Sequence, residues 1–304
     1  MKTAQKTFSK RRYRFFQAGF FILLFLLGFT AYANYDYWVF KYLIADHYIF
    51  TDALDTLYDA QLGGENVKGY RRDFDRVVIA AVTEKIRAVN RDGYTYLYTP
   101  EGYETSRETE KTDAKRAYIE ALPVPGAVYL YLPNISKLTR EFVYDNRAEL
   151  AGYDRLVLDL RGNYGGLLND FYRIADLFTE KGAVLGHEQT RLPFLTHAVK
   201  AKSDIYFHFD TIIILQDERT ASAAEGLIQA LKQQVPGVVL AGEKTFGKGI
   251  GQVTVPLTGG YAVRATVLLV QGPDGGTVHQ TGIEPDFRAA GEDPLALALR
   301  LLEN

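Results

Sequence analysis

The chain has 304 residues, 47% of them hydrophobic and 24% charged, which is enough to bury one core of about 150–200 residues with a smaller region attached. A net charge of −2 provides no basic field, so we expect no nucleic-acid partner. Zero cysteines exclude disulfides, thiolate metal sites and a cysteine nucleophile, which leaves Ser, Thr, Lys or a carboxylate for covalent catalysis.

The N-terminus combines a basic flank with an uncharged apolar stretch. Residues 1–14 end in a cluster of Lys and Arg, and residues 15–33 carry no charge. At about 1.5 Å per helical residue this stretch can cross a bilayer core of about 30 Å. Because the basic flank should stay in the cytoplasm, we expect a cytoplasmic tail at 1–14, a single-pass anchor in the cell membrane at 15–33 and an extracytoplasmic remainder.

A cleaved secretory signal is the alternative for the same stretch, because Ala31-Tyr32-Ala33 fits a small-x-small cleavage pattern. The protein would then be secreted. Aromatic residues between 32 and 38 fit the interface belt of an anchor and favour the uncleaved form. Both interpretations export the remainder of the chain.

Residues 34–125 form the expected N-terminal helical region and linker. Apolar residues recur at helical spacing from Tyr37 to about Leu62 and again from Phe74 to Val89. Arg91–Tyr103 predicts a turn, a short aromatic strand and a Pro-initiated turn or helix start. Residues 104–117 are strongly polar and fit either a solvated linker or a helix.

From Gly126 the pattern changes to alternating strands and helices, which predicts an α/β catalytic domain over residues 126–304. Strands are expected at Ala127–Leu132, Arg155–Leu160, Thr211–Leu215, Val238–Ala241, Gln252–Pro256 and Tyr261–Leu269. Helices are expected at Leu168–Lys181, Ala223–Gln234 and Pro294–Leu302, the last capped by Asp293. Thr258-Gly259-Gly260 predicts a hairpin turn between the last two strands.

Three strands run into polar turns rich in small residues, at 156–166, 215–227 and 240–252. Such strand ends bind ligands in open α/β sheets. Ser222 lies at one strand-to-helix junction, where N–H groups of a helix start can hold a developing oxyanion. Ser222 and Glu225 also form S-x-x-E, the capping box that simply starts a helix. On these four residues alone the structural interpretation is the simpler one.

Lys248 lies between two glycines in the third turn. Gly242 and Gly247-Lys248 match most of a phosphate-binding loop, but Gly249 follows where a magnesium-binding hydroxyl is needed. A β-like run also replaces the helix that would hold the phosphates, which argues against nucleotide binding. The five histidines show no ligand spacing, so we expect no metal and no cofactor.

Several ordered motifs together resemble the carboxyl-terminal processing peptidases, also called tail-specific proteases, a serine–lysine family. They are Tyr98–Tyr103, Asp159–Gly166 (D-L-R-x-N-x-G-G), Ser222–Glu225, Gly242–Gln252 (G-x-x-T-F-G-K-G-x-x-Q) and Gly282–Asp286 (G-I-x-P-D). The match spans roughly residues 74–302. Ordered agreement of several motifs is a far stronger signal than any one of them.

The resemblance implies a crotonase/Clp-protease-like core of mixed β-sheets and helices. It also implies Ser222 as nucleophile, Lys248 as general base and Gln252 as the residue that orients the lysine. The implied oxyanion donors are the backbone N–H of Ala223 and that of Gly165 or Gly166. A lysine is a base only when neutral, and lowering its pKa from about 10.4 to near 7.5 needs about 4 kcal/mol, which burial among apolar neighbours such as Phe246 can supply.

One departure concerns the PDZ domain that members of this family usually carry. Only residues 104–125 separate the first motif from the first catalytic strand, too few for such a domain. Recognition of a substrate C-terminus through a PDZ groove is therefore not expected.

We thus expect a membrane-anchored serine endopeptidase that acts on extracytoplasmic proteins or peptides. The alternatives are a catalytically inactive peptide- or lipid-binding protein on the same fold and a non-peptide serine hydrolase. The sequence makes no prediction of oligomeric state.

Overall fold

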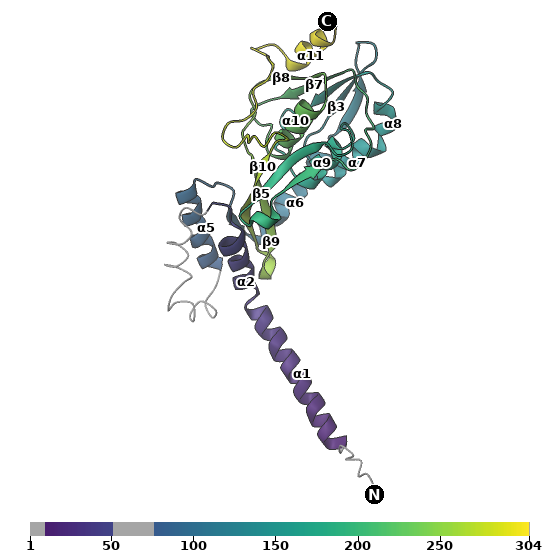
Figure 1. Cartoon of the computed structure of the whole chain (residues 1–304). Helices are drawn as coiled ribbons and strands as arrows, with labels where there is room; N and C mark the ends of the chain where they lie inside the picture. Colours follow the sequence, from purple (N-terminus) through teal and green to yellow (C-terminus); the bar gives the residue numbers. More distant parts are fainter. Residues whose placement is uncertain (1–9, 51–75, 304) are drawn as a thin grey trace.

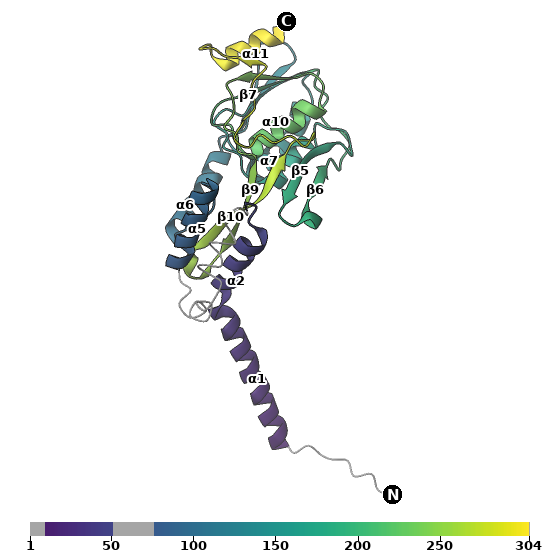
Figure 2. The same cartoon turned by 60° about the vertical axis from the view of Figure 1, so that its left-hand side comes forward.

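The structure, a computed structural model, describes residues 10–50 and 76–303 (Figure 1). Its first helix, α1 (Lys10–Ala33), projects away from the rest of the molecule in two views (Figure 1 and Figure 2). Residues 15–33 have a mean hydropathy of 1.9 and are 0% buried. By length and composition this helix can cross a membrane, although a signal sequence has the same properties.

The second helical segment is shorter than expected. α2 (Tyr35–Lys41) passes into the π-helix η1 (Tyr42–His47), and Tyr48 is already extended, with φ −60° and ψ 128°. The helix expected from Tyr37 to about Leu62 therefore ends at His47, and residues 51–75 lie outside the described part. The physical reason is a tertiary contact, because the buried Tyr48 donates its hydroxyl to the Asp92 carboxylate at 3.0 Å.

The N-terminal helices pack against the smaller sheet. Their buried side chains include Phe40 and Ile44 of the first segment and Ile79 and Ile86 of α5 (Arg76–Asn90), the second expected helix. Strand β10 (Ala262–Gln271) supplies the facing residues Val263, Ala265 and Val267. This cluster fastens the region next to α1 to the body of the protein.

Within the described residues the larger sheet has six strands in the order β11-β8-β7-β4-β3-β2, parallel except for the edge strand β2. Their bounds are β2 Tyr118–Ala121, β3 Ala127–Tyr131, β4 Arg155–Asp159, β7 Thr211–Gln216, β8 Val238–Gly242 and β11 Phe287–Arg288. The four central strands, β3, β4, β7 and β8, lie within one residue of the predicted bounds, so these predictions are confirmed. β2 and β11 were not expected.

Helices cover both faces of this sheet. Alternate residues of a strand point to opposite faces, and Leu156 and Leu158 of β4 pack with α7, α9 and α10, whereas Val157 packs with α11. The helices on these faces are α7 Lys137–Asp145, α8 Arg147–Leu150, α9 Leu168–Ala175, α10 Ala223–Gln234 and α11 Pro294–Glu303. α9 ends earlier than expected, because tight turns follow, with the Phe178 N–H donating to Ala175.

The smaller sheet has five strands among the described residues. Four of them follow the order β1-β10-β5-β6, the fifth, β9, pairs with β10, and all pairs are antiparallel. The bounds are β1 Tyr96–Tyr98, β5 Val184–Thr190, β6 His197–Lys200, β9 Ile250–Pro256 and β10 Ala262–Gln271, with a short 3₁₀ turn, η2, at Pro193–Leu195. The expected hairpin turn is present as η3 (Thr258–Gly260), where Gly259 has φ 67°.

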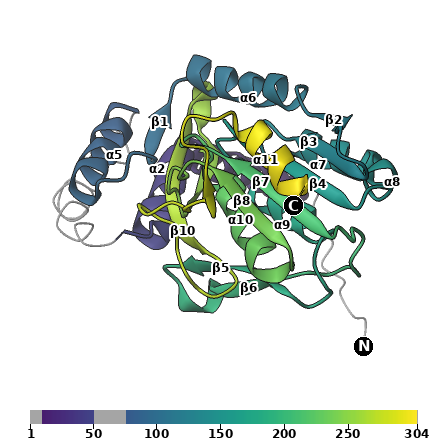
Figure 3. The same ribbon diagram turned by 90° about the horizontal axis from the view of Figure 1, so that it is seen from above.

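Helix α6 (Pro100–Ala114) and β2 occupy the segment between the first motif and the first catalytic strand. α6 runs from the smaller sheet at β1 towards β2 (Figure 3). Residues 104–125, all of them described, thus contain the rest of a helix and one strand. The expected mixed α/β fold is confirmed.

Candidate active site

The carboxyl ends of β4, β7 and β8 lie side by side, because these strands are parallel neighbours. Asp159 pairs with Leu215, and Gln216 pairs with Gly242, at the last positions of the register. The three polar segments recognised in the sequence therefore meet at one edge of the larger sheet. Ligands bind at such an edge in open α/β folds.

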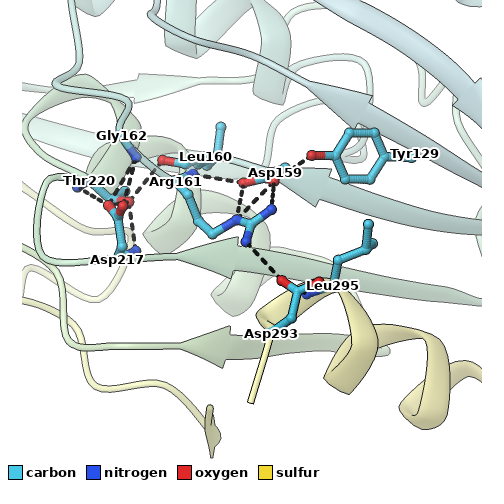
Figure 4. A network of polar contacts seen from close by, with 9 residues as sticks. All are labelled: Tyr129, Asp159, Leu160, Arg161, Gly162, Asp217, Thr220, Asp293 and Leu295. Atoms are coloured by element: carbon cyan, nitrogen blue, oxygen red, sulfur yellow. Dashed lines mark hydrogen bonds and ion pairs between the residues drawn. The ribbon is translucent and has the colours of Figure 1, made fainter. Parts of the chain in front are cut away.

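Figure 4 shows how the first segment is held. The buried Asp159 carboxylate accepts hydrogen bonds from Arg161 Nε at 2.9–3.0 Å and from the Tyr129 hydroxyl at 2.5 Å. Burial and the charge of Asp159 raise the pKa of Tyr129, so this tyrosine remains a donor. Arg161 also contacts Asp293, the residue before α11, at 3.5 Å. The chain is thereby fixed just before the glycine pair.

A second group of hydrogen bonds joins the first segment to the second (Figure 4). The Asp217 carboxylate accepts from the Gly162 N–H at 2.9 Å and from the Thr220 N–H at 3.0 Å. Thr220 Oγ1 in turn donates to the Leu160 carbonyl at 2.8 Å. The loops after β4 and β7 consequently form one unit.

Asn163 shapes the loop around the glycine pair. Its side chain is fully buried; Nδ2 donates to the Leu132 carbonyl at 2.8 Å, and Oδ1 accepts from the Gly165 N–H at 2.9 Å. Its backbone carbonyl accepts from the Ala221 N–H at 2.9 Å. Asn163 therefore ties the glycine pair to the residue that precedes Ser222.

Gly165 and Gly166 are required because the backbone comes too close for any side chain. A Cβ on Gly165 would lie 2.7 Å from Ser222 Cβ and 2.8 Å from the Ala223 nitrogen. A Cβ on Gly166 would lie 1.8 Å from the Ile135 carbonyl oxygen. Both residues also have positive φ, 92° and 151°, which favours glycine. Gly165 is thus packed directly against Ser222, and Gly166 against Ile135.

Ser222 has an unusual backbone. Its φ of 58° and ψ of −119° match the first central position of a type II′ turn, where glycine is normal. An ordinary N-cap residue has β-region angles. Such a conformation costs of order 1–3 kcal/mol in a non-glycine residue and is found mainly at functional sites. The simple capping-box interpretation does not account for this strain.

Glu225 joins the serine loop to the lysine loop. Its carboxylate is fully buried, and Oε2 accepts from the backbone N–H groups of Ser222 and Lys248, each at 2.8 Å. Oε1 accepts from Thr245 Oγ1 at 2.6 Å and from the Gly247 N–H at 2.7 Å. The sequence identified Glu225 only as a capping-box residue, and its bonds to the third segment were not foreseen.

Lys248 is a partly buried lysine whose pKa lies below its ordinary value. Burial, and secondly the charge of Arg264, lower its pKa to about 8, although Glu225 and Asp92 oppose the shift. Its Nζ lies 4.5 Å from the centre of the Tyr94 ring. The sequence had suggested Phe246 as an apolar cover for the amine. That suggestion was wrong, because Phe246 is 57% exposed.

Gln252 lies on β9, opposite Thr266 of β10. Its Oε1 accepts a hydrogen bond from Arg264 Nη2 at 3.2 Å, and its Nε2 is buried without a partner in the described part of the chain. The structure therefore packs Ser222 and Ala223 against Gly165 and joins the backbone of Ser222 to that of Lys248 through Glu225. It places Gln252 against Arg264, and the role of Gln252 in orienting the lysine stays a prediction.

Comparison with known proteins identifies the family. The model of Peptidase family S41 matches residues 126–289, more than half of the chain, and the protein belongs to this family. Two curated relatives described as "Probable CtpA-like serine protease" are similar: one from Staphylococcus epidermidis with 34% identity and one from Staphylococcus aureus with 35%, each over 145 residues. The match covers 46% of this chain and 28% of each relative, so the chain corresponds to only part of their length.

A solved structure extends the likeness to the N-terminal region. A lipoprotein from Streptococcus agalactiae is similar over 90% of this chain and 96% of its own, with a TM-score of 0.63 and 18% identity. At this identity the comparison supports the shared fold. The resemblance to the carboxyl-terminal processing peptidases that the motifs indicated is confirmed by the family match.

Proposed function

We propose that the protein is a serine endopeptidase that acts outside the cytoplasm through a Ser222–Lys248 centre. The observation that carries the proposal is the backbone strain of Ser222, held against Gly165 and linked through Glu225 to the loop of Lys248. The bond between the Ser222 N–H and Glu225 is also half of a capping box, but a structural N-cap needs neither the strained backbone nor the link to the loop of Lys248. Membership of a peptidase family supports the same reaction class.

The pKa of Lys248, about 8, suits a general base near neutral pH. Neutral Nζ takes the proton of Ser222 Oγ as the oxygen attacks the scissile carbonyl carbon. The protonated amine then gives that proton to the leaving nitrogen, the C–N bond breaks, and an acyl-enzyme remains on Ser222. Water, deprotonated by Lys248, attacks the ester and releases the acid and the free serine.

Two backbone N–H groups fit the oxyanion role. The Gly165 N–H is already used, because it donates to Asn163 Oδ1 at 2.9 Å. Those of Gly166 and Ala223 have no acceptor among the hydrogen bonds of the described residues. Of the pair suggested by the sequence, Gly166 is therefore the better donor beside Ala223, and both would face charge that develops in the transition state.

A serine-directed fluorophosphonate probe tests this function. We expect the probe to modify Ser222, as found by peptide mapping, and both labelling and cleavage of a protein substrate such as casein to be lost in Ser222→Ala and Lys248→Ala. A suitable control is Lys244→Ala, whose exposed amine contacts Glu284 on the surface. No labelling of folded protein would favour the inactive binding protein. Labelling with ester hydrolysis but no peptide cleavage would favour the non-peptide hydrolase.

The proposed substrates are extracytoplasmic proteins or peptides. α1 would hold the catalytic domain at the membrane, and the structure offers no PDZ domain in the described residues 104–125 to read a substrate carboxylate. Selection would then rest on side chains near the scissile bond and on proximity to the bilayer. Small or apolar residues at the cleavage point suit a site lined by glycines and alanines.

A further inference from the structure

Tyr94 is the side chain that lies against the amine of Lys248. The amine nitrogen Nζ stands over the Tyr94 ring, 4.5 Å from its centre, well inside the range of about 6 Å in which a ring face attracts an ammonium group. In the part of the chain that the structure describes, the Lys248 N–H donates to Glu225, but Nζ has neither a hydrogen-bond nor an ion-pair partner. Gln252, which the sequence predicted to orient the lysine, is bonded to Arg264 instead. The ring of Tyr94 is therefore the contact that the structure provides for this amine.

The ring is held by the turn before β1, and Asp92 is the centre of that turn. The Asp92 carboxylate is only 2% exposed, and its Oδ1 accepts from the Tyr94 N–H at 2.9 Å and from Thr266 Oγ1 at 3.2 Å. Its Oδ2 accepts from Thr95 Oγ1 at 2.6 Å and from the Tyr48 hydroxyl at 3.0 Å. The Thr266 N–H also donates to Thr95 Oγ1 at 3.0 Å. Because a buried carboxylate is costly to leave without its donors, these bonds fix the Tyr94 backbone relative to β10.

The face of the ring, rather than the hydroxyl of Tyr94, meets the amine. Tyr94 is half-buried, and among the described residues its hydroxyl has no hydrogen-bond partner. Burial, followed by the charges of Asp92 and Glu225, raises the pKa of Tyr94. The phenol therefore keeps its proton and does not form an ion pair with the lysine.

We propose that Tyr94 is a positioning residue of the Ser222–Lys248 centre: the face of its ring holds the Lys248 amine, and the buried Asp92 carboxylate holds the ring. The inference rests on the proposed function and adds to it a group from the N-terminal region, outside the residues 126–289 that match the family model. A lysine has a flexible four-carbon stem and loses much conformational freedom when it is ordered. A lysine base therefore needs a contact that favours one position of its amine.

The contact with the ring becomes stronger during the reaction. Neutral Nζ gains its charge when it takes the proton of Ser222 Oγ, and a ring face attracts the resulting ammonium more than the neutral amine. An interaction that is stronger in the transition state than in the bound substrate raises kcat rather than lowering KM. A tyrosine that only fills space beside the lysine loop would not produce this pattern, so kinetics distinguish the two roles.

The test compares substitutions of Tyr94 at about pH 9, where a lysine with a pKa of about 8 is mostly neutral before the reaction. Tyr94→Phe keeps the ring and removes the hydroxyl, and Tyr94→Leu removes the ring. Tyr206→Leu is the matched control, because Tyr206 is also partly exposed and its ring lies 5.7 Å from the guanidinium of Arg147 on α8. Two properties are measured: kcat and KM for a peptide that the wild type cleaves, and trace acetylation of Lys248 by acetic anhydride with peptide mapping. The second reports the accessibility of the amine without requiring catalysis.

We expect Tyr94→Leu to lower kcat about 10-fold with little change in KM and to speed the acetylation of Lys248, because the amine loses both its contact and its cover. Tyr94→Phe and the control should keep the wild-type values. Wild-type kcat and acetylation in folded Tyr94→Leu would overturn the inference. An equal loss of kcat in Tyr94→Phe would also overturn it, because the hydroxyl and not the ring would then be responsible.

Two further variants complete the test. If Tyr94→Leu does not fold, a ring-fluorinated phenylalanine at the same position keeps the shape but weakens the negative ring face, and a kcat equal to that of Tyr94→Phe would count against the ring. Asp92→Asn turns an NH₂ group towards one of the four donors, so it should change kcat and acetylation in the same direction as Tyr94→Leu; unchanged values in the folded variant would refute the role of Asp92. If acetylation responds to Tyr94→Leu but the wild type neither cleaves peptides nor labels Ser222, the proposed function fails and the contact between Tyr94 and Lys248 stands.

Discussion

Substituting Glu225 by glutamine is the sharpest perturbation of the site, because the change is isosteric and removes only a charge and one acceptor. The carboxylate accepts from the N–H groups of Ser222, Lys248 and Gly247 and from the Thr245 hydroxyl. In either orientation the amide turns its NH₂ group towards at least one of these backbone donors. One or two hydrogen bonds to a charged acceptor are lost, at about 1.5–3 kcal/mol each.

We therefore expect Glu225→Gln to lower the free energy of unfolding by about 2–6 kcal/mol, a large part of the stability of a typical domain. Chemical denaturation measures this loss. In the folded fraction the serine and lysine loops are held to one another more weakly, so labelling of Ser222 by the fluorophosphonate probe should slow.

The pH profile of the same variant has a predictable sign. Glu225 raises the pKa of Lys248, so removal of its charge should move the midpoint of activity to lower pH. The control is Glu104→Gln, which alters an exposed ion pair with Arg107 and should change stability by less than about 1 kcal/mol. Glu225→Gln with wild-type stability and a wild-type labelling rate would refute the reasoning.

The pKa of Lys248, about 8, predicts that kcat/KM of the wild type rises with pH and levels off above this value, because only the neutral amine is a base; an optimum near pH 5 would contradict the assignment. Gly165→Ala should abolish Ser222 labelling, since the new Cβ meets backbone, whereas Gly93→Ala has open space around its Cβ and should label normally. A reporter that is active only outside the cytoplasm should be active when fused after Lys41, and a soluble product starting at Asn34 would instead favour signal cleavage. A peptide substrate and its amidated form should have similar kcat/KM, and a loss of 100-fold, about 2.7 kcal/mol, on amidation would reveal a carboxylate-reading element.

Periodicity predicted the central strands and α10 well, because these elements are buried and their hydrophobic pattern is long. β5 and β6 were missed, since Val184–Thr190 contains Gly, His, Glu and Gln and has little strand pattern of its own. That strand forms because β10 offers a long edge for pairing. The early end of the helix at His47 likewise reflects a tertiary contact of Tyr48, which no local pattern contains.

The site was only partly visible in the sequence. The motifs identified Ser222, Lys248 and the glycine pair, but the strain at Ser222 depends on backbone angles that S-x-x-E does not encode. Glu225 could have been singled out as a buried carboxylate on the apolar side of α10.

The contacts just beyond α1 determine how far the proposed peptidase can reach. The Asp36 carboxylate accepts from the N–H and hydroxyl of Thr258 at 2.8 and 2.7 Å, and the Tyr35 hydroxyl donates to the Pro256 carbonyl at 3.3 Å. With α1 in the bilayer, the β9–β10 hairpin is fastened to the end of the anchor rather than suspended from a flexible chain. The proposed catalytic groups would then lie at a fixed height above the lipid. A membrane-bound substrate would be selected by the number of residues between its scissile bond and its own transmembrane segment.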